Sequence, residues 1–147
     1  MHRREFLSAA AVIAVELGGC ARPWIRKTTD PLQGKTLSPR QWANLHAVVD
    51  HLLPADGDLV GAAQVGAVGY IDAVMADAGT ADDDKSNFID GLAALNRAAQ
   101  KIGASDFAFL DVIERESLLR TFEGSAQGRR WLNLVLRHTL EAYLGDP

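Results

Sequence analysis

The sequence contains a single cysteine, Cys20, and this scarcity excludes several kinds of site. One thiol can form neither an internal disulfide, nor a thiolate zinc centre, nor an iron–sulfur cluster, and no Cys-x-x-Cys-His haem motif is present. The chain also lacks a basic cluster, and its net charge of -4 makes it a poor binder of nucleic acid. The domain must therefore be held together by hydrophobic packing.

Familiar catalytic motifs are missing as well. There is no Gly-x-Gly-x-x-Gly, no phosphate loop and no Gly-x-Ser-x-Gly nucleophile elbow. His46 and His51 are five residues apart and would point about 140° apart on a helix. His138 and Glu141 allow a local pair, which falls short of a binuclear metal site. We therefore expect no catalytic residue, metal or cofactor in this chain.

The apolar run near the N-terminus is too short to span a membrane. It covers residues 8–15 and is interrupted by Glu16, whereas crossing about 30 Å of hydrocarbon takes roughly 20 helical residues. The apolar run is preceded by two arginines and followed by small residues. This order of a basic, an apolar and a small-residue segment is typical of a secretory signal. Four residues resemble the twin-arginine export signal, which implies cargo that folds before export: Arg3, Arg4, Phe6 and Leu7. The alternative is an ordinary N-terminal helix.

Cys20 gains a meaning from this context. Leu17-Gly18-Gly19-Cys20 resembles the lipobox of bacterial lipoproteins, in which the cysteine is acylated. Acyl chains contribute about 0.8 kcal/mol per buried CH₂, so a multiply acylated Cys20 would tether the domain to a membrane. Otherwise Cys20 is a spare thiol. We divide the chain into a signal peptide (1–19), a flexible linker (20–36) and a domain (37–147). We expect the domain to be located in the periplasm or at the periplasmic face of the membrane.

The domain is predicted to be all-α, a small bundle of about five helices. Ser38, Pro39 and Gln41 form a capping box that opens the first helix, and Pro54 ends it. The second helix is expected over 62–78, the third between the Asp82-Asp83-Asp84 run and Gly103, the fourth from Asp111 to Gly124, and the last over 125–144. The expected buried positions include Val65, Ile102, Ile113 and Phe122, and a plug of Phe107, Phe109 and Leu110.

Two acidic stretches raise the question of a cation site. Asp56 and Asp58 alternate in the loop after the first helix, with His51 nearby, but a third acidic ligand and a closing glutamate are missing. We interpret both as solvated turn carboxylates. The three aspartates at 82–84 are placed where a helix N-terminus favours negative charge.

Aromatic residues give a clue to a partner, because buried anchors of interfaces are often Trp or Tyr. Trp24, Trp42, Trp131, Tyr70 and Tyr143 are the candidates, and for Trp42 and Trp131 a place in the core is an equal alternative.

Several segments together resemble the gluconate 2-dehydrogenase subunit 3 family, over most of the chain from Leu37 onward. They are Leu52-Leu53-Pro54-Ala55-Asp56, Gly61-Ala62, Tyr70-Ile71-Asp72, the 88–95 helix, Phe107 with Leu110, and the closing run from Leu140 to Pro147. The resemblance implies a small, exported, non-catalytic subunit of a sugar or sugar-acid dehydrogenase. It also implies a large subunit of the glucose-methanol-choline type that carries FAD, a cytochrome c subunit in many complexes, and a role in assembly and twin-arginine export.

From the resemblance and the surface aromatics together, we expect the partner interface to involve these residues: Trp42, Pro54, Asp56, Gly61, Tyr70, Trp131 and Tyr143. Two other hypotheses stay open. One is a free-standing periplasmic lipoprotein with a scaffold or ligand-binding role. The other is a small enzyme or metal protein.

Overall fold

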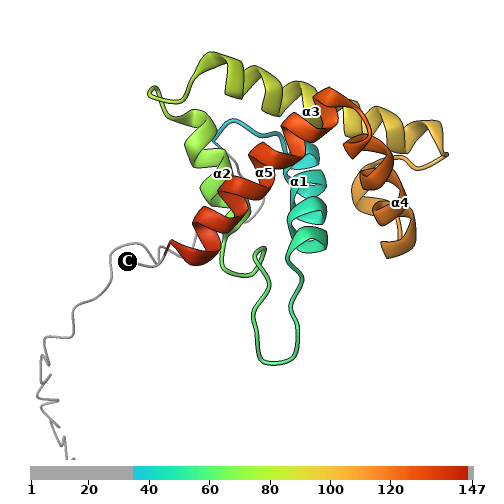
Figure 1. The fold of residues 1–147 in the computed structure, drawn as a ribbon, viewed down its shortest axis with the longest axis horizontal. Coiled ribbons are helices and arrows are strands. Elements are labelled where there is room, and N and C mark those ends of the chain that lie inside the picture. The colour runs from blue at the N-terminus through green and yellow to red at the C-terminus, as the bar shows by residue number, and fades with distance from the viewer. Residues whose placement is uncertain (1–34, 146–147) are drawn as a thin grey trace, which may run out of the picture.

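The computed structural model describes residues 35–145, and that part of the chain is a bundle of five α-helices (Figure 1). A single 3₁₀ turn, η1, separates the third helix from the fourth, and the only β-type pairing among these residues is an isolated bridge. The elements are α1 (Pro39–Leu52), α2 (Ala67–Ala76), α3 (Asp82–Lys101), η1 (Phe107–Phe109), α4 (Val112–Glu123) and α5 (Ala126–Leu144). The predicted all-α fold is confirmed.

Local capping signals set three of the helix starts. The Ser38 side chain accepts a hydrogen bond from the Gln41 backbone N–H, and the Gln41 side chain in turn accepts one from the Ser38 N–H. Asp111 and Glu114 form the same reciprocal pair at the start of α4. Ser125 caps α5 through the Gly128 N–H. These bonds satisfy N–H groups that have no partner inside the helix, so the predicted starts are confirmed.

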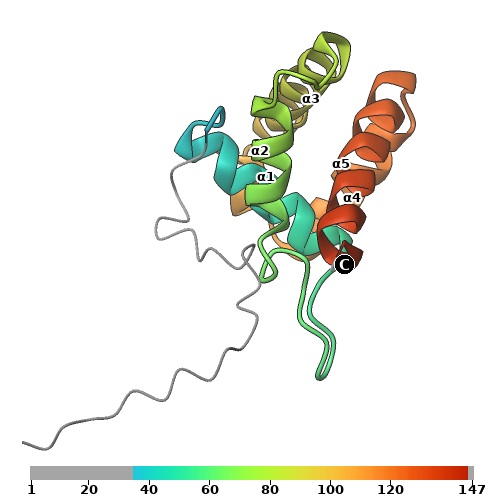
Figure 2. The same ribbon diagram turned by 90° about the vertical axis from the view of Figure 1, so that its left-hand side faces the viewer.

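Helix α5 crosses the bundle and touches each of the other four α-helices (Figures 1 and 2). Trp131 lies at this crossing, fully buried, and its Nε1–H donates to the carbonyl oxygen of Phe88 on α3 over 2.9 Å. Its ring meets Phe122 edge-on, with centroids 5.7 Å apart. The core is made of side chains from all five α-helices and from η1. Among residues 35–145, no helix has both the length and the apolar character that a bilayer crossing requires.

The second helix is shorter than predicted. It begins at Ala67 rather than at residue 62, because Gly66 adopts a left-handed backbone with φ of 89°, which interrupts helical hydrogen bonding. Residues 62–66 form turns instead, closed by the bond from Gln64 N–H to the Gly61 carbonyl oxygen at 3.0 Å. The spacing of alanine and valine residues predicted a continuous helix from residue 62 and did not reveal the interruption at Gly66.

Four predicted core residues lie at the surface: Val65, Ile102, Phe109 and Ile113. Phe109 belongs to a 3₁₀ turn, which has about three residues per turn, so Phe107 and Leu110 share the inward side and Phe109 does not. Ile113 lies in the first turn of α4, and no other part of residues 35–145 covers that position. Phe122 is half-buried.

Candidate partner interface

A rigid hairpin joins α1 to α2. We call it the 53–62 hairpin, because the Ala62 N–H donates to the Leu53 carbonyl oxygen at its base over 3.0 Å. Near the tip, Asp56 and Leu59 exchange two backbone hydrogen bonds, of 3.1 and 2.9 Å. Gly57 lies between them with φ of 55°, a left-handed conformation that suits glycine. In Figures 1 and 2 the hairpin projects away from the helices.

Gly61 closes the hairpin by close backbone approach. An added Cβ would lie 2.8 Å from the Ala55 nitrogen and 3.2 Å from the Leu53 carbonyl oxygen, so a larger residue would push the two sides apart. The Gly61 N–H also donates to the Gln64 side chain over 2.9 Å. Of the predicted interface residues, Pro54 and Asp56 are exposed on this hairpin, and Gly61 is a buried structural residue that cannot offer a side chain.

Tyr70 is held in place by a polar cluster between α2 and α5. Its hydroxyl donates to Glu141 over 3.3 Å, and His138 Nδ1 lies 2.6 Å from the same carboxylate. Partial burial raises the pKa of Tyr70, and the negative charge of Glu141 raises it further. Tyr70 is therefore a neutral hydroxyl with a fixed orientation.

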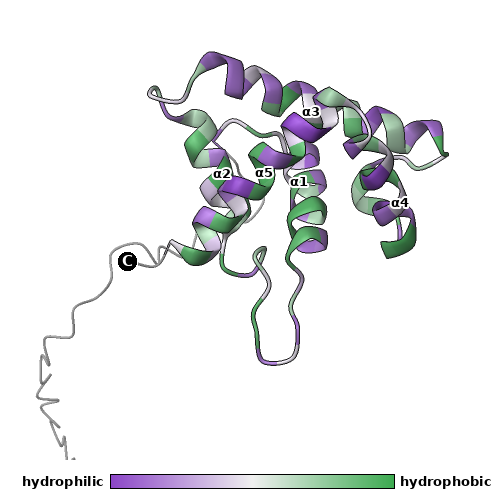
Figure 3. Ribbon diagram, viewed as in Figure 1, coloured by the Kyte–Doolittle hydropathy of each residue, from purple (hydrophilic) through white to green (hydrophobic). Residues whose placement is uncertain are grey.

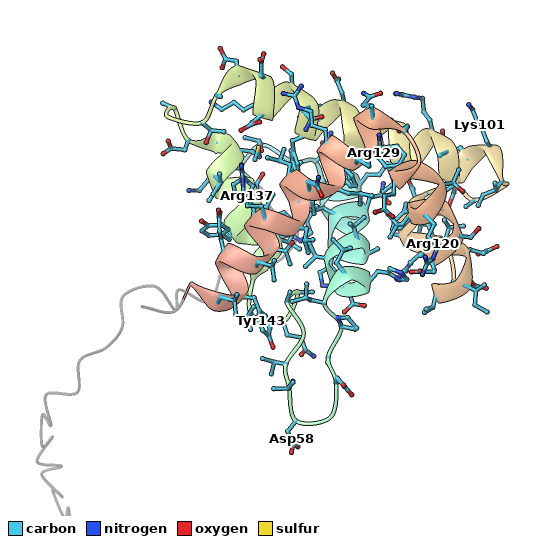
Figure 4. The ribbon with its side chains drawn as sticks, viewed as in Figure 1. Asp58, Lys101, Arg120, Arg129, Arg137 and Tyr143 are labelled. Carbon is cyan, nitrogen blue, oxygen red and sulfur yellow. The ribbon has the colours of Figure 1, made fainter. Side chains whose placement is uncertain are left out.

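Tyr143 is half-buried near the end of α5. Figure 4 shows it on the same side of the molecule as the hairpin, whose tip carries Asp58. Tyr143 thus lies on the side of the molecule from which the hairpin projects.

The same end of the molecule exposes large apolar side chains. Leu59 and Val60 on the hairpin are 65% and 53% exposed. Leu140 and Leu144 are exposed on the last turns of α5. Three more are exposed at the end of η1 and the start of α4: Phe109, Val112 and Ile113. His51, next to the hairpin, pairs with Glu116 over 2.7 Å and so brings the first half of α4 beside the end of α1. Figure 3 shows both hydrophilic and apolar colouring on the hairpin, and apolar colouring at the α4 end nearest to it. We call this region the hairpin end.

The two tryptophans of the described residues belong to the core. Trp131 is fully buried and Trp42 almost so. The structure therefore supports the alternative that both are core residues, and it leaves Trp131 no surface with which to bind a partner. Helical spacing could not separate the two interpretations, because a buried and an exposed tryptophan occupy similar positions in a sequence pattern.

Residues 35–145 contain two further grooves, and one of about 430 Å³ lies between α1 and α4, with Asp50 and Arg115 among its lining residues. The other groove, of about 490 Å³ between α3 and α5, is polar, and its Arg137 is already within 3.8 Å of Asp84 and 3.9 Å of Glu141. No group of three or more His, Cys, Asp or Glu side chains within residues 35–145 is arranged to hold a metal ion. The predicted signal and lipidation residues Arg3, Arg4, Phe6, Leu7 and Cys20, together with Trp24, lie outside the described residues.

Charge is strongly segregated along the chain, which the sequence analysis missed. Between Arg40 and Lys85 there are eight aspartates and no lysine or arginine. This stretch contains the end of α1, the hairpin and α2. A count of charges by segment, rather than over the whole chain, reveals it.

Comparison with known proteins gives one match. No curated protein sequence and no solved structure matches the chain significantly. One family profile, described as gluconate 2-dehydrogenase subunit 3, matches residues 39–147. The matched region begins at the first residue of α1 and includes all five helices and the hairpin. This match spans most of the chain, and the chain belongs to the gluconate 2-dehydrogenase subunit 3 family.

Proposed function

We propose that this protein is a non-catalytic accessory subunit of a flavin-dependent gluconate or sugar dehydrogenase complex. The catalytic partner is a large subunit of the glucose-methanol-choline type that carries FAD, and a cytochrome c subunit with haem completes the complex. The observation that carries the proposal is that the domain belongs to this family. In addition, the hairpin end of the domain exposes a group of large apolar side chains. Exposed apolar surface of this kind marks a site of protein association.

The second part of the proposal is export. A flavoprotein acquires its cofactor in the cytoplasm, so it must cross the membrane already folded. The Arg3-Arg4-Glu5-Phe6-Leu7 run on this chain would serve such cargo, and the large subunit would travel bound to it. Acylation of Cys20 would then hold the assembled complex at the periplasmic face of the membrane.

A free-standing periplasmic lipoprotein is the alternative function, and the Leu17-Gly18-Gly19-Cys20 run is the feature that favours it. The exposed apolar residues of the hairpin end argue for the accessory subunit instead, since a domain that works alone has no use for such a surface.

Co-expression tests the proposal. The full chain is expressed with each glucose-methanol-choline-type flavoprotein that the same genome encodes, and periplasmic FAD and dehydrogenase activity are measured. We expect the two proteins to co-purify, and the double substitution Arg3→Lys with Arg4→Lys to retain both in the cytoplasm. A flavoprotein that is exported and fully active without this chain would overturn the proposal, as would the absence of any flavoprotein that binds it.

A further inference from the structure

The 53–62 hairpin is preformed although it packs against little. Backbone bonds close it at its base and at its tip, and Gly61 permits the close approach of its two sides. Figures 1 and 2 show that it extends beyond the helical body, so the core does not determine its conformation at the tip. A loop that is ordered before binding loses less conformational entropy when it binds, which favours association.

The hairpin is acidic at its tip and apolar on its returning side. Leu59 and Val60 are adjacent and both largely exposed. Asp56 and Asp58 lie at the tip, whereas Asp50, on the last turn of α1, lines a separate groove together with His46 and Arg115. Within residues 35–145, none of these three aspartates forms an ion pair. The nearest lysine or arginine in the sequence is Arg40 on one side and Lys85 on the other.

This combination defines the chemistry of a binding partner. Two adjacent apolar side chains gain free energy only when a partner removes them from water. Asp56 and Asp58, which form no ion pair within residues 35–145, attract a positively charged surface and repel a negative one. Anionic lipid headgroups are therefore disfavoured as the occupant, and so is the hairpin of a second copy of this chain.

We propose that the 53–62 hairpin inserts Leu59 and Val60 into an apolar pocket of the catalytic large subunit, and that lysine and arginine side chains of that subunit border the pocket and pair with Asp56 and Asp58. This inference rests on the proposed function, because it takes the large subunit as the partner. It assigns the hairpin as the main contact and specifies the charge of the opposing surface.

The test uses the full chain co-expressed with the same flavoproteins, and measures the dissociation constant of the purified proteins. Leu59→Ser with Val60→Ser removes the apolar contact, and we expect the affinity to fall about tenfold or more. Asp56→Asn with Asp58→Asn removes two charges and keeps the shape of the side chains. Its loss of affinity is expected to be about threefold to tenfold at low salt and to shrink near about 0.5 M salt.

Matched controls come from the opposite side of the bundle. Ile102→Ser changes an exposed apolar residue just after α3, close to Lys101, which Figure 4 shows far from the hairpin tip. Asp90→Asn with Glu123→Gln removes two exposed charges outside the acidic stretch. Both controls are expected to bind like the wild type. All variants are compared by circular dichroism and by Tm, so that a loss of binding is not confused with a loss of fold.

The outcomes separate the two claims. If the wild-type proteins do not associate, the proposed function fails and this inference fails with it. If they associate and the Leu59→Ser, Val60→Ser variant binds equally well, only the hairpin inference fails. If the Asp56→Asn, Asp58→Asn variant binds more tightly, the opposing surface is not basic. Hairpin-dependent dimerisation in sedimentation, or hairpin-dependent binding to vesicles containing anionic lipid, would assign the hairpin to another occupant.

Discussion

Gly91 of α3 lies directly under the indole ring of Trp131, so closely that a Cβ at Gly91 would overlap Cδ1 and Cγ of that ring. The absence of a side chain at residue 91 allows α5 to approach α3, and it lets the Trp131 Nε1–H reach the Phe88 carbonyl oxygen. The bundle therefore depends on a glycine inside a helix, where glycine is otherwise unfavourable by about 1 kcal/mol relative to alanine.

Gly91→Ala is expected to destabilise the domain by about 1–3 kcal/mol, because the indole ring must move and the core becomes overpacked. Thermal or urea unfolding measures the change. Gly69→Ala on α2 is the matched control, since its Cβ would lie 3.6 Å from Trp42, an ordinary contact. The control should be neutral or slightly stabilising. Equal effects of the two substitutions would contradict this account of the α3–α5 contact.

Asp72 connects α2 to the segment that precedes α1. Its buried carboxylate accepts hydrogen bonds from the backbone N–H groups of Lys35, Thr36 and Leu37 and from the Thr36 hydroxyl. Burial by itself would raise the pKa of Asp72, but these hydrogen bonds outweigh it and lower the pKa below its ordinary value. Asp72→Asn places an amide against N–H donors and should cost about 1–3 kcal/mol near neutral pH.

The pH dependence of unfolding is a second test of Asp72. A folded-state pKa below the unfolded value means that the unfolded chain binds the proton more readily. The stability from Asp72 is thus present above about pH 4 and is lost as the pH falls through the lower folded-state pKa. We expect the Asp72→Asn variant to lose less stability on acidification than the wild type, and Asp90→Asn on the exposed face of α3 to follow the wild type. Parallel curves for wild type and Asp72→Asn would refute this.

Asn44 holds the 3₁₀ turn on the bundle. It is buried, its amide donates to Asn96 over 3.1 Å, and its carbonyl oxygen accepts from the Ala108 N–H over 3.0 Å. Asn44→Ala leaves the Ala108 N–H without this partner and is expected to cost about 1–3 kcal/mol. Hydrogen exchange of the Phe107 and Ala108 amides should accelerate. Asn133→Ala, an exposed asparagine on α5, is the control and should leave both quantities unchanged.

The exposed apolar residues at the start of α4 should contribute little to folding. Phe109 and Ile113 are 77% and 80% exposed. Phe109→Ser with Ile113→Ser is expected to change the free energy of unfolding by less than about 0.5 kcal/mol for each site. The isolated chain should also aggregate less, because apolar surface is removed. A large drop in Tm would show that these side chains pack more than their exposure indicates.

Patterns confined to neighbouring residues were sufficient to predict much of the fold. The capping boxes at Ser38 and Asp111, the glycine after α3 and the negative first turn of α3 are all present as expected. Each depends on hydrogen bonds or dipole interactions within one or two turns, which a sequence displays directly. The family resemblance was likewise visible in short segments, and the profile match over 39–147 confirms it.

What no local pattern determined was the environment of each apolar side chain. Helical spacing predicts which residues share a face, but Trp131 is buried and Ile113 is exposed because of where α5 and α4 lie relative to the rest of the bundle. The same applies to the hairpin, whose form depends on the left-handed Gly57 and on the narrow gap at Gly61. The sequence by itself therefore determined the helices and the family. Only the tertiary structure decided which apolar residues remain for a partner, because burial depends on contacts between segments far apart in the chain.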